Sequence, residues 1–124
     1  MARYRLSGPA KADIANILKT SADRHGHRAS LRYRALLTAA FRRIAIDPTG
    51  HSTADRSELR PGMRSFHIRH SLRDSVKPRV ANPVHVIYYR SQEPDLIEII
   101  RVLHERMEPT RYVEDPPGSE PEQR

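Results

Sequence analysis

The chain has 124 residues, of which 37% are hydrophobic and 30% are charged, so it fits one domain with a modest apolar core. Its 22 Lys and Arg against 15 Asp and Glu give a formal net charge of +7 at pH 7. The absence of cysteine excludes disulfides and thiolate chemistry, and no stretch approaches the roughly 20 apolar residues of a membrane span. We expect a soluble, cytoplasmic protein without a signal peptide.

The charge is distributed unevenly along the chain. Of the net +7, residues 114–124 contribute −3, which leaves +10 for residues 1–113. Only three of the basic residues are lysine, and the planar guanidinium of arginine suits carboxylate and phosphate partners. The composition therefore admits an acidic protein or a nucleic acid as the partner. It is equally consistent with a bias in the base composition of the coding genome.

A short strand and an amphipathic helix are predicted at the N-terminus. Residues 3–6 can form the strand, and the following Ser7-Gly8-Pro9 breaks the chain and can start a helix with Ser7 as its cap. The helix ends before Gly26. Its apolar residues fall at positions i, i+3 and i+4, namely Ile14, Ile17 and Leu18.

A second, clearer helix is predicted from Ala29 to about Ile46. One face carries a continuous apolar stripe of Tyr33, Leu36, Leu37, Ala40, Phe41 and Ile44. Four arginines lie largely off this stripe, namely Arg32, Arg34, Arg42 and Arg43. A connection at residues 25–28 should join the two helices into an antiparallel hairpin.

Three strands are predicted in the second half of the chain. Residues 63–70 alternate as a strand does, and residues 84–90 are a β-prone run. After a turn at 93–95, residues 96–103 are apolar and short enough to form a buried strand. Residues 71–83 are charged, contain two prolines and are predicted to be a mobile inserted loop.

The order of a strand, two helices and three strands predicts an α+β fold. The helical hairpin would pack on one face of a three- to four-stranded, mostly antiparallel sheet. Residues 1–112 would form this single domain, and the acidic, proline-rich residues 113–124 would be disordered. Tyr88 and Tyr89 are adjacent on a strand, so one should lie in the core and the other should face out.

Four segments together resemble a known family. The helix motif Ala10-x-x-Asp13-Ile14-x-x-Ile17 and the turn Leu59-Arg60-Pro61-Gly62-x-Arg64 are similar to the first helix of ParE-type toxins and to the turn before their second strand. The segment His85-x-Ile87-x-Tyr89-Arg90 resembles their third strand. The segment IEIIRVLHERM, residues 97–107, resembles their closing strand and C-terminal turn almost residue for residue. The resemblance covers roughly residues 3–112 and points to the ParE branch of the ParE/RelE superfamily.

The resemblance implies the toxin of a type II toxin–antitoxin system. A ParD-like antitoxin with an acidic C-terminal segment would hold it inactive in a hetero-oligomer, and free toxin of the ParE kind is associated with inhibition of DNA gyrase. RelE-type relatives share the fold but cleave messenger RNA in the ribosome, so the fold does not choose between them. We expect a non-enzymatic gyrase inhibitor without a cofactor. A ribosome-dependent RNA endonuclease is the alternative, and a non-toxic basic nucleic-acid-binding domain is the second alternative.

The resemblance places the toxic site at the end of the last predicted strand. The residues expected to bind the target are Arg101, His104, Glu105, Arg106 and Met107. Support is expected from Arg60, Arg64 and Arg90. The apolar residues from Ile97 to Leu103 would mainly hold the fold, whereas the charged residues of this set have no evident structural need.

Antitoxin binding is expected to extend over the two helices and the sheet. Their basic, partly apolar surface can receive an acidic segment that folds onto it, and the net charge of residues 1–113 would speed the encounter. The residues expected to contact the antitoxin are Ile14, Ile17, Leu18, Arg32, Arg42, Arg43 and Arg90.

RNA cleavage and metal binding are the two other chemical possibilities. A nuclease needs an acid, a base and cations, and its candidates would be Arg64, Tyr89, Arg90, His104 and Arg106. The three lysines lie in the first helix and the inserted loop, which weighs against this activity. No metal site is predicted, because His67 and His70 would point to opposite faces of a strand and His25-x-His27 has no neighbouring carboxylate cluster.

Overall fold

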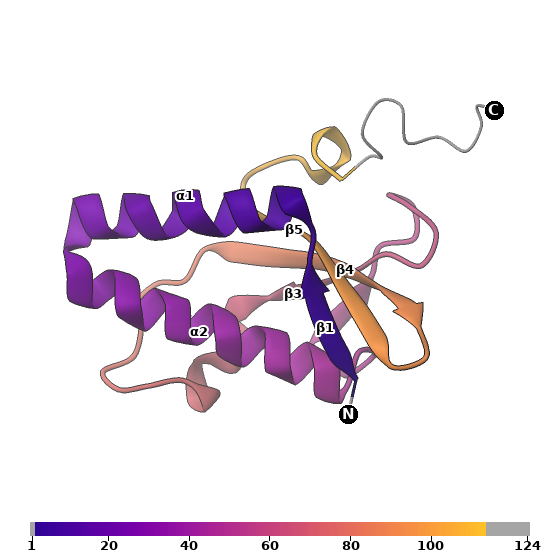
Figure 1. Cartoon of the computed structure of the whole chain (residues 1–124), viewed down its shortest axis with the longest axis horizontal. Coiled ribbons are helices and arrows are strands. Elements are labelled where there is room, and N and C mark those ends of the chain that lie inside the picture. The colour runs from indigo at the N-terminus through magenta and orange to yellow at the C-terminus, as the bar shows by residue number, and fades with distance from the viewer. Residues whose placement is uncertain (1, 114–124) are drawn as a thin grey trace.

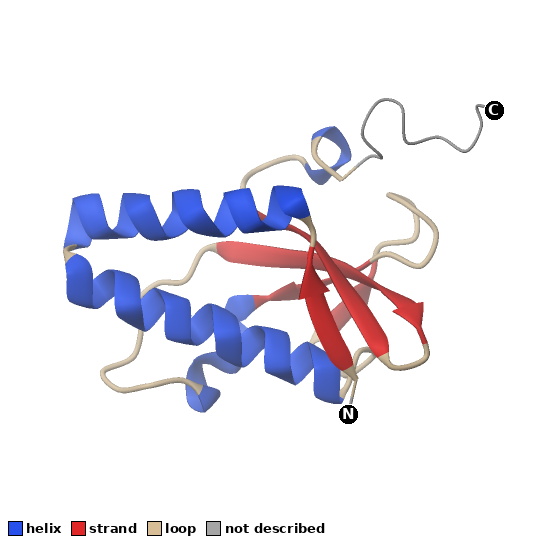
Figure 2. Ribbon diagram, viewed as in Figure 1, coloured by secondary structure: helices blue, strands red, loops and turns tan. Residues whose placement is uncertain are grey.

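A helical hairpin lies across one face of a mixed β-sheet in the computed structural model, which describes residues 2–113 (Figures 1 and 2). In chain order the elements are β1 (Arg3–Leu6), α1 (Gly8–His25), α2 (His27–Ile46), β2 (Thr53–Asp55), β3 (Arg64–His67), the 3-10 helix η1 (Ile68–Asp74), β4 (His85–Glu93), β5 (Leu96–His104) and the 3-10 helix η2 (Pro109–Arg111). No helix in this part of the chain is long and apolar enough to cross a membrane. The predicted disorder of residues 114–124 lies outside the described residues.

The sheet has five strands in the order β1-β5-β4-β3-β2. β1 runs parallel to β5, and the other neighbours are antiparallel, so the predicted α+β class with a mostly antiparallel sheet is confirmed. The fifth strand, β2, was not predicted. Its three residues, Thr53-Ala54-Asp55, are too few and too polar for an alternating apolar pattern, and they form a strand by pairing with β3 at the edge of the sheet.

The hairpin is tighter than the sequence predicts. Ser7 caps α1 as expected, because its Oγ accepts a hydrogen bond from the backbone N–H of Ala10 at 3.0 Å. Gly26 has φ of 94°, a conformation that favours glycine, and it alone joins the two helices. The second helix therefore begins at His27, two residues before the predicted Ala29.

The first apolar core lies between α2 and the sheet. The predicted stripe on α2 is confirmed, since all six of its residues are buried. They pack against side chains from one face of the sheet, namely Phe66, Ile87, Tyr89, Ile97, Ile99 and Val102. The Tyr89 side chain is fully buried, and its hydroxyl donates a hydrogen bond to the carbonyl oxygen of Pro48 at 2.5 Å.

A second, smaller apolar core covers the opposite face of the sheet. It consists of the buried residues Met63, Tyr88, Ile100, Leu103 and Val113. Tyr88 is only 5% exposed, so the prediction that one of the two adjacent tyrosines faces out is wrong. The C-terminal segment brings Val113 onto this face, and Val113 therefore belongs to the folded domain rather than to the start of the tail.

The predicted strand over residues 63–70 is shorter than expected. It ends at His67, whose Nδ1 accepts a hydrogen bond from the backbone N–H of Arg69 at 3.1 Å and thereby turns the chain into η1. Ile68 and Ser71 are buried within η1, which contacts α2. His70 consequently lies in η1 and not on a strand, and η1 takes up the first residues of the predicted inserted loop.

Candidate functional site

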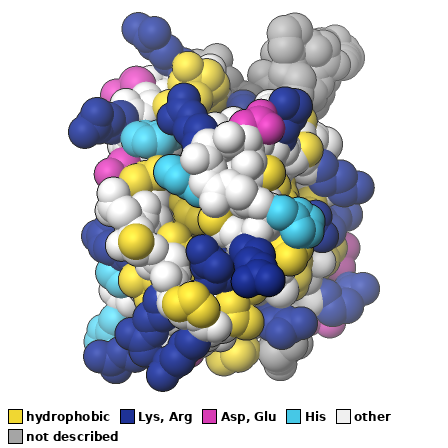
Figure 3. All heavy atoms as spheres, turned by 90° about the vertical axis from the view of Figure 1, so that its left-hand side faces the viewer, with side chains coloured by type: hydrophobic (Ala, Val, Ile, Leu, Met, Phe, Trp, Pro, Cys, Tyr) yellow, Lys and Arg dark blue, Asp and Glu magenta, His cyan; other side chains and the backbone are white. Residues whose placement is uncertain are grey.

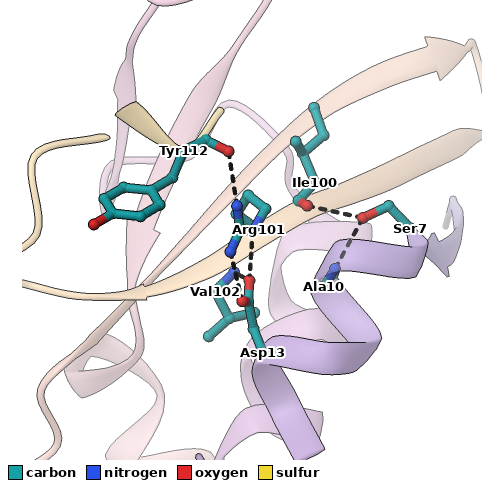
Figure 4. Close-up of polar contacts among 7 residues, drawn as sticks. All are labelled: Ser7, Ala10, Asp13, Ile100, Arg101, Val102 and Tyr112. Carbon is teal, nitrogen blue, oxygen red and sulfur yellow. Dashed lines mark hydrogen bonds and ion pairs between the residues drawn. The ribbon is translucent and has the colours of Figure 1, made fainter. Parts of the chain in front are cut away.

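Two side chains bind the edge of β5 beyond the point where its parallel partner β1 ends (Figure 4). They are Ser7, the cap of α1, and Asp13 of α1. β1 pairs with β5 only as far as Ile99. Beyond that point the hydroxyl of Ser7 donates to the carbonyl oxygen of Ile100 at 2.8 Å, and the backbone N–H of Val102 donates to Oδ2 of Asp13 at 3.0 Å. The first turns of α1 thus satisfy backbone groups that a longer β1 would otherwise bind.

Arg101 joins α1, β5 and the C-terminal segment (Figure 4). Its Nε and Nη2 each donate to one carboxylate oxygen of Asp13 at 2.7 Å, and its Nη1 donates to the carbonyl oxygen of Tyr112 at 2.9 Å. The hydrogen bonds that Arg101 donates to Asp13 raise the pKa of Arg101. The expectation that Arg101 has no structural need is therefore wrong, because a bidentate ion pair holds two segments together through this side chain.

The turn after β5 contains the other residues of the predicted toxic site. The backbone N–H of Met107 donates to the carbonyl oxygen of His104 at 2.9 Å, which closes the turn. Glu105 is also engaged, since its Oε1 lies 2.7 Å from Nε2 of His67, and this hydrogen bond lowers the pKa of Glu105. Met107 is half-buried against the second core. Arg106 alone of this set is an exposed cation that has no ion pair among residues 2–113.

The residues proposed for RNA cleavage do not converge. Arg64 is opposite Tyr89 in the sheet and donates to Oγ1 of Thr53 at 2.8 Å. Burial raises the pKa of Tyr89, so its hydroxyl stays protonated at neutral pH. His104 is paired with His85 in the sheet. His85 lies four residues along β4 from Tyr89, so the positions of His85 and Tyr89 are roughly 13 Å apart. The candidate acids, bases and cations therefore lie at two separate places on the sheet.

A histidine–tyrosine cluster that the sequence did not single out lies at the start of β4. The backbone N–H of Val84 donates to the Tyr33 hydroxyl at 3.2 Å, and that hydroxyl lies 2.6 Å from Nδ1 of His85. Burial lowers the pKa of His85 to about 4, so its ring is neutral at pH 7. The centroid of the His104 ring lies 5.7 Å from the centroid of the His85 ring. The signal was hidden because these residues meet only after β4 and β5 have paired and α2 has packed on them.

The residues predicted to bind an antitoxin separate into several surfaces. The apolar residues of α1, namely Ile14, Ile17 and Leu18, are partly buried against the first core. Arg32 lines a pocket at the end of the hairpin, together with Ile17. Arg42 and Arg43 line a groove along α2. Arg90 lines neither pocket, and its Nε is buried without a hydrogen-bond partner among the described residues.

The groove along α2, hereafter the α2 groove, has a volume of about 580 Å³. It is lined by Leu31, Arg34, Ala35, Thr38, Ala39, Arg42, Arg43, Ile46, Asp74, Ser75 and Val76. All three large hydrophobic residues that are exposed in residues 2–113 lie in it, with exposed fractions of 49% for Leu31, 63% for Ile46 and 50% for Val76. The sequence did not reveal them, because Leu31 and Ile46 lie off the buried stripe and Val76 follows η1.

The fold and these surfaces define a small, strongly basic α+β protein with an exposed apolar groove and a compact C-terminal turn. Residues 4–109 match the family described as ParE toxin of type II toxin-antitoxin system, parDE. The chain therefore belongs to the family of ParE toxins of type II toxin–antitoxin systems, as the resemblance in its sequence predicted.

Known relatives agree with this assignment. The chain is 36% identical over 107 residues to Toxin ParE1 of Caulobacter vibrioides, covering 86% of this chain and 93% of the relative. It is 30% identical over 109 residues to Toxin ParE1 of Mycobacterium tuberculosis, covering 88% and 95% respectively. A solved structure described as the chromosomal ParDE TA system from P. aeruginosa matches with a TM-score of 0.54 at 16% identity, over 84% of this chain and 96% of that chain, which supports the fold.

Proposed function

We propose that a ParD-like antitoxin neutralises this toxin by placing an acidic, amphipathic segment in the α2 groove, and that the free toxin inhibits DNA gyrase without acting as an enzyme. The observation that carries the antitoxin part is the gathering of Leu31, Ile46 and Val76 in one arginine-lined groove. Apolar side chains that are exposed together on a small soluble protein mark an interaction surface.

The shape of the α2 groove fits a helix. From Leu31 to Ile46 its length is roughly 22 Å, which corresponds to about four turns of a partner helix. Ala35 and Ala39 lie between these ends and leave room for a close approach. A partner helix with apolar residues at i, i+3, i+4 and i+7 would bury the exposed side chains of the groove.

The charge of the α2 groove fits an acidic partner. Arg34 and Arg42 line it and form no ion pair within residues 2–113. Arg43 is 3.5 Å from the carboxylate of Asp74, but both side chains are about half exposed, so a stronger partner can compete for it. Carboxylates beside the apolar stripe of the incoming helix would meet these arginines and speed the encounter.

Substitutions in the α2 groove test the antitoxin proposal. The double variant Leu31→Glu, Ile46→Glu places two carboxylates where the antitoxin helix would bury apolar side chains. We expect it to weaken binding of the antitoxin encoded beside the toxin by at least about 100-fold, since burying two charges costs several kcal/mol. The matched control is Ala12→Glu, an exposed position on α1 outside the groove. Equal affinity of both variants, measured by calorimetry, would exclude this groove as the site.

The target is tested separately from the antitoxin. The resemblance of the last strand and turn to ParE-type toxins supports gyrase, and the separation of the nuclease candidates on the sheet argues against RNA cleavage. Expression from a regulated promoter should arrest growth, and the purified toxin should inhibit supercoiling by gyrase while messenger RNA stays intact. Cleavage of messenger RNA at ribosomal positions would establish the endonuclease instead. Normal growth would point to a binding role alone.

Arg106 is the residue proposed to contact the target. Its side chain is exposed at the turn after β5 and has no ion pair among the described residues. We expect Arg106→Ala to reduce gyrase inhibition by at least about tenfold, the effect of losing one charge-assisted contact, without changing the melting temperature. Arg111→Ala, a nearby exposed arginine on η2, is the control. Full inhibition by Arg106→Ala would move the target site elsewhere.

A further inference from the structure

A second concave surface lies at the end of the helical hairpin, away from the α2 groove residues. This hairpin-end pocket has a volume of about 760 Å³ and lies between the second half of α1, the first turns of α2, the loop before β4, and the ends of β4 and β5. Figure 3 looks onto this end of the molecule, where Lys, Arg and His side chains surround a hollow that exposes hydrophobic side chains. Its volume is in the range of sites that hold small organic ligands.

The lining of the hairpin-end pocket contains three arginines. They are Arg24 from α1, Arg32 from α2 and Arg79 from the loop, and no Asp or Glu of residues 2–113 lines the pocket. None of the three guanidinium groups forms an ion pair or a hydrogen bond with another described residue. Three like charges that approach one pocket from three segments repel one another, so an anion between them would stabilise the arrangement.

The floor of the pocket contains a neutral histidine ring. The Tyr33 hydroxyl accepts from the backbone N–H of Val84 and shares a second hydrogen bond with Nδ1 of His85. In the tautomer in which the hydroxyl donates to Nδ1, His85 carries its proton on Nε2, and the lowered pKa of this ring keeps it neutral at pH 7. No described residue accepts a hydrogen bond from this Nε2–H, and His85 lines the pocket, so the donor is available to a ligand.

A phosphate fits these groups better than a carboxylate does. A phosphate monoester presents three terminal oxygens and up to two negative charges, whereas a carboxylate presents two oxygens and one charge. Three guanidinium groups and a ring N–H exceed what one carboxylate can accept. The pocket also contains apolar side chains, Ile17, Val80 and Val84, against which an organic group can pack.

We propose that the hairpin-end pocket binds a phosphate monoester of nucleotide size. Arg24, Arg32 and Arg79 bind the phosphate group, His85 donates to an oxygen of the ligand, and the apolar side chains contact its organic part. Two sources share this chemistry, namely a free mononucleotide and the 5′-phosphate at the end of a nucleic acid strand. The site is separate from the α2 groove and meets the turn after β5 only at His104, which does not contact the phosphate in this proposal, so the existence of the site does not depend on the proposed antitoxin or target.

The test measures binding to the purified full-length toxin by calorimetry at low salt. The probes are adenosine 5′-monophosphate, adenosine, a four-nucleotide DNA with and without a 5′-phosphate, and a peptide of alternating Asp and Ala. We expect the monophosphate to bind saturably and adenosine not to bind. If the phosphorylated DNA binds more tightly than the mononucleotide, the strand end is the ligand; if it binds no more tightly, the free nucleotide is.

Two arginine substitutions locate the site. Arg32→Ala and Arg79→Ala should each weaken binding of the monophosphate at least tenfold, and Arg34→Ala is the matched control because this exposed arginine of α2 lines the other groove. Melting temperatures of all three variants show whether each is folded. The proposal is wrong if the monophosphate does not bind, if it binds equally to the Arg32 and Arg34 variants, or if the acidic peptide binds more tightly than every phosphate probe.

Discussion

The two faces of the sheet are covered in different ways. On one face, two long helices bury an extensive core in which Leu36, Ile44 and Ile87 are fully inaccessible. On the other face, the C-terminal segment covers a core of five buried residues and is held by two arginine–backbone contacts, from Arg101 to Tyr112 and from Arg60 to Val113 at 3.1 Å. The helical face stabilises the fold, and the second face positions the turn after β5.

The largest effect is expected from the helical face. Leu36→Ala removes a side chain that is fully buried between α2 and the sheet, and we expect it to lower the free energy of unfolding by about 3 to 4 kcal/mol. The measurement is urea unfolding followed by circular dichroism. A loss below about 1 kcal/mol would mean that this face does not dominate stability.

The next largest effect on the free energy of unfolding is expected from acid, which acts on the helical face through His85. The pKa of His85 falls from 6.5 to about 4 in the folded protein, so the unfolded chain binds a proton in that pH range and the folded protein does not. The contribution of His85 to stability is therefore fully present above pH 6.5 and is lost as the pH falls toward 4, by roughly 2 to 3 kcal/mol. The groups that act on this ring are His104, His67, Asp13 and Glu105.

Urea unfolding of wild type and of His85→Gln at pH 7 and at pH 4.5 isolates the contribution of His85. The variant should lose less stability on acidification than the wild type does. An equal loss in both proteins would assign the pH dependence to the carboxylates instead.

Asp13 connects the two faces, and its substitution should have a smaller effect. Asp13→Ala removes both oxygens that bind Arg101 and leaves the N–H of Val102 without its acceptor. We expect a loss of about 2 kcal/mol, reduced from the full cost of a buried pair because Arg101 is 21% exposed. Asp13→Asn keeps one oxygen and should recover part of the loss. Hydrogen exchange should become faster at Tyr112 and Val113, which would separate this variant from a general loss of stability.

The smallest effect on stability is expected on the second face. Val113→Ala removes two methyl groups from a side chain that is 1% exposed, which costs about 1.5 kcal/mol. We expect the folded variant to inhibit gyrase less strongly than the wild type does, because the C-terminal segment packs beside Met107 in the turn. Antitoxin affinity, measured on the same protein, should not change. A parallel loss of both activities would show that the two faces are not separable.

The helical face could be predicted from the sequence because its signals are local. The spacing of apolar residues on α2 and the Ser7 cap appear within a few neighbouring positions, and both are confirmed. The second face could not be predicted. The Tyr88-Tyr89 pair alternates faces as a strand requires, but only the return of the C-terminal segment to the sheet shows that Tyr88 is buried as well.

The candidate sites also divide into features that a local sequence pattern indicates and features that only the folded structure shows. The sequence resemblance predicted a site at the turn after β5, but it could not show that Arg101 binds Asp13, since 88 residues separate the two. It also could not show that Arg24, Arg32 and Arg79 line one pocket, because this depends on how the hairpin and the loop before β4 meet. Side chains that act together across long sequence separations become visible only in three dimensions.

The parallel pairing of β1 with β5 has a consequence for synthesis of the toxin on the ribosome. β1 is made first, but its partner residues, Leu96 to Ile99, are among the last of the domain to be made. Contacts between distant parts of a chain form late, because the intervening loop must close first. The nascent chain therefore carries an unpaired N-terminal strand throughout most of its elongation. The sheet that supports the turn after β5 is completed only when the C-terminal strand emerges.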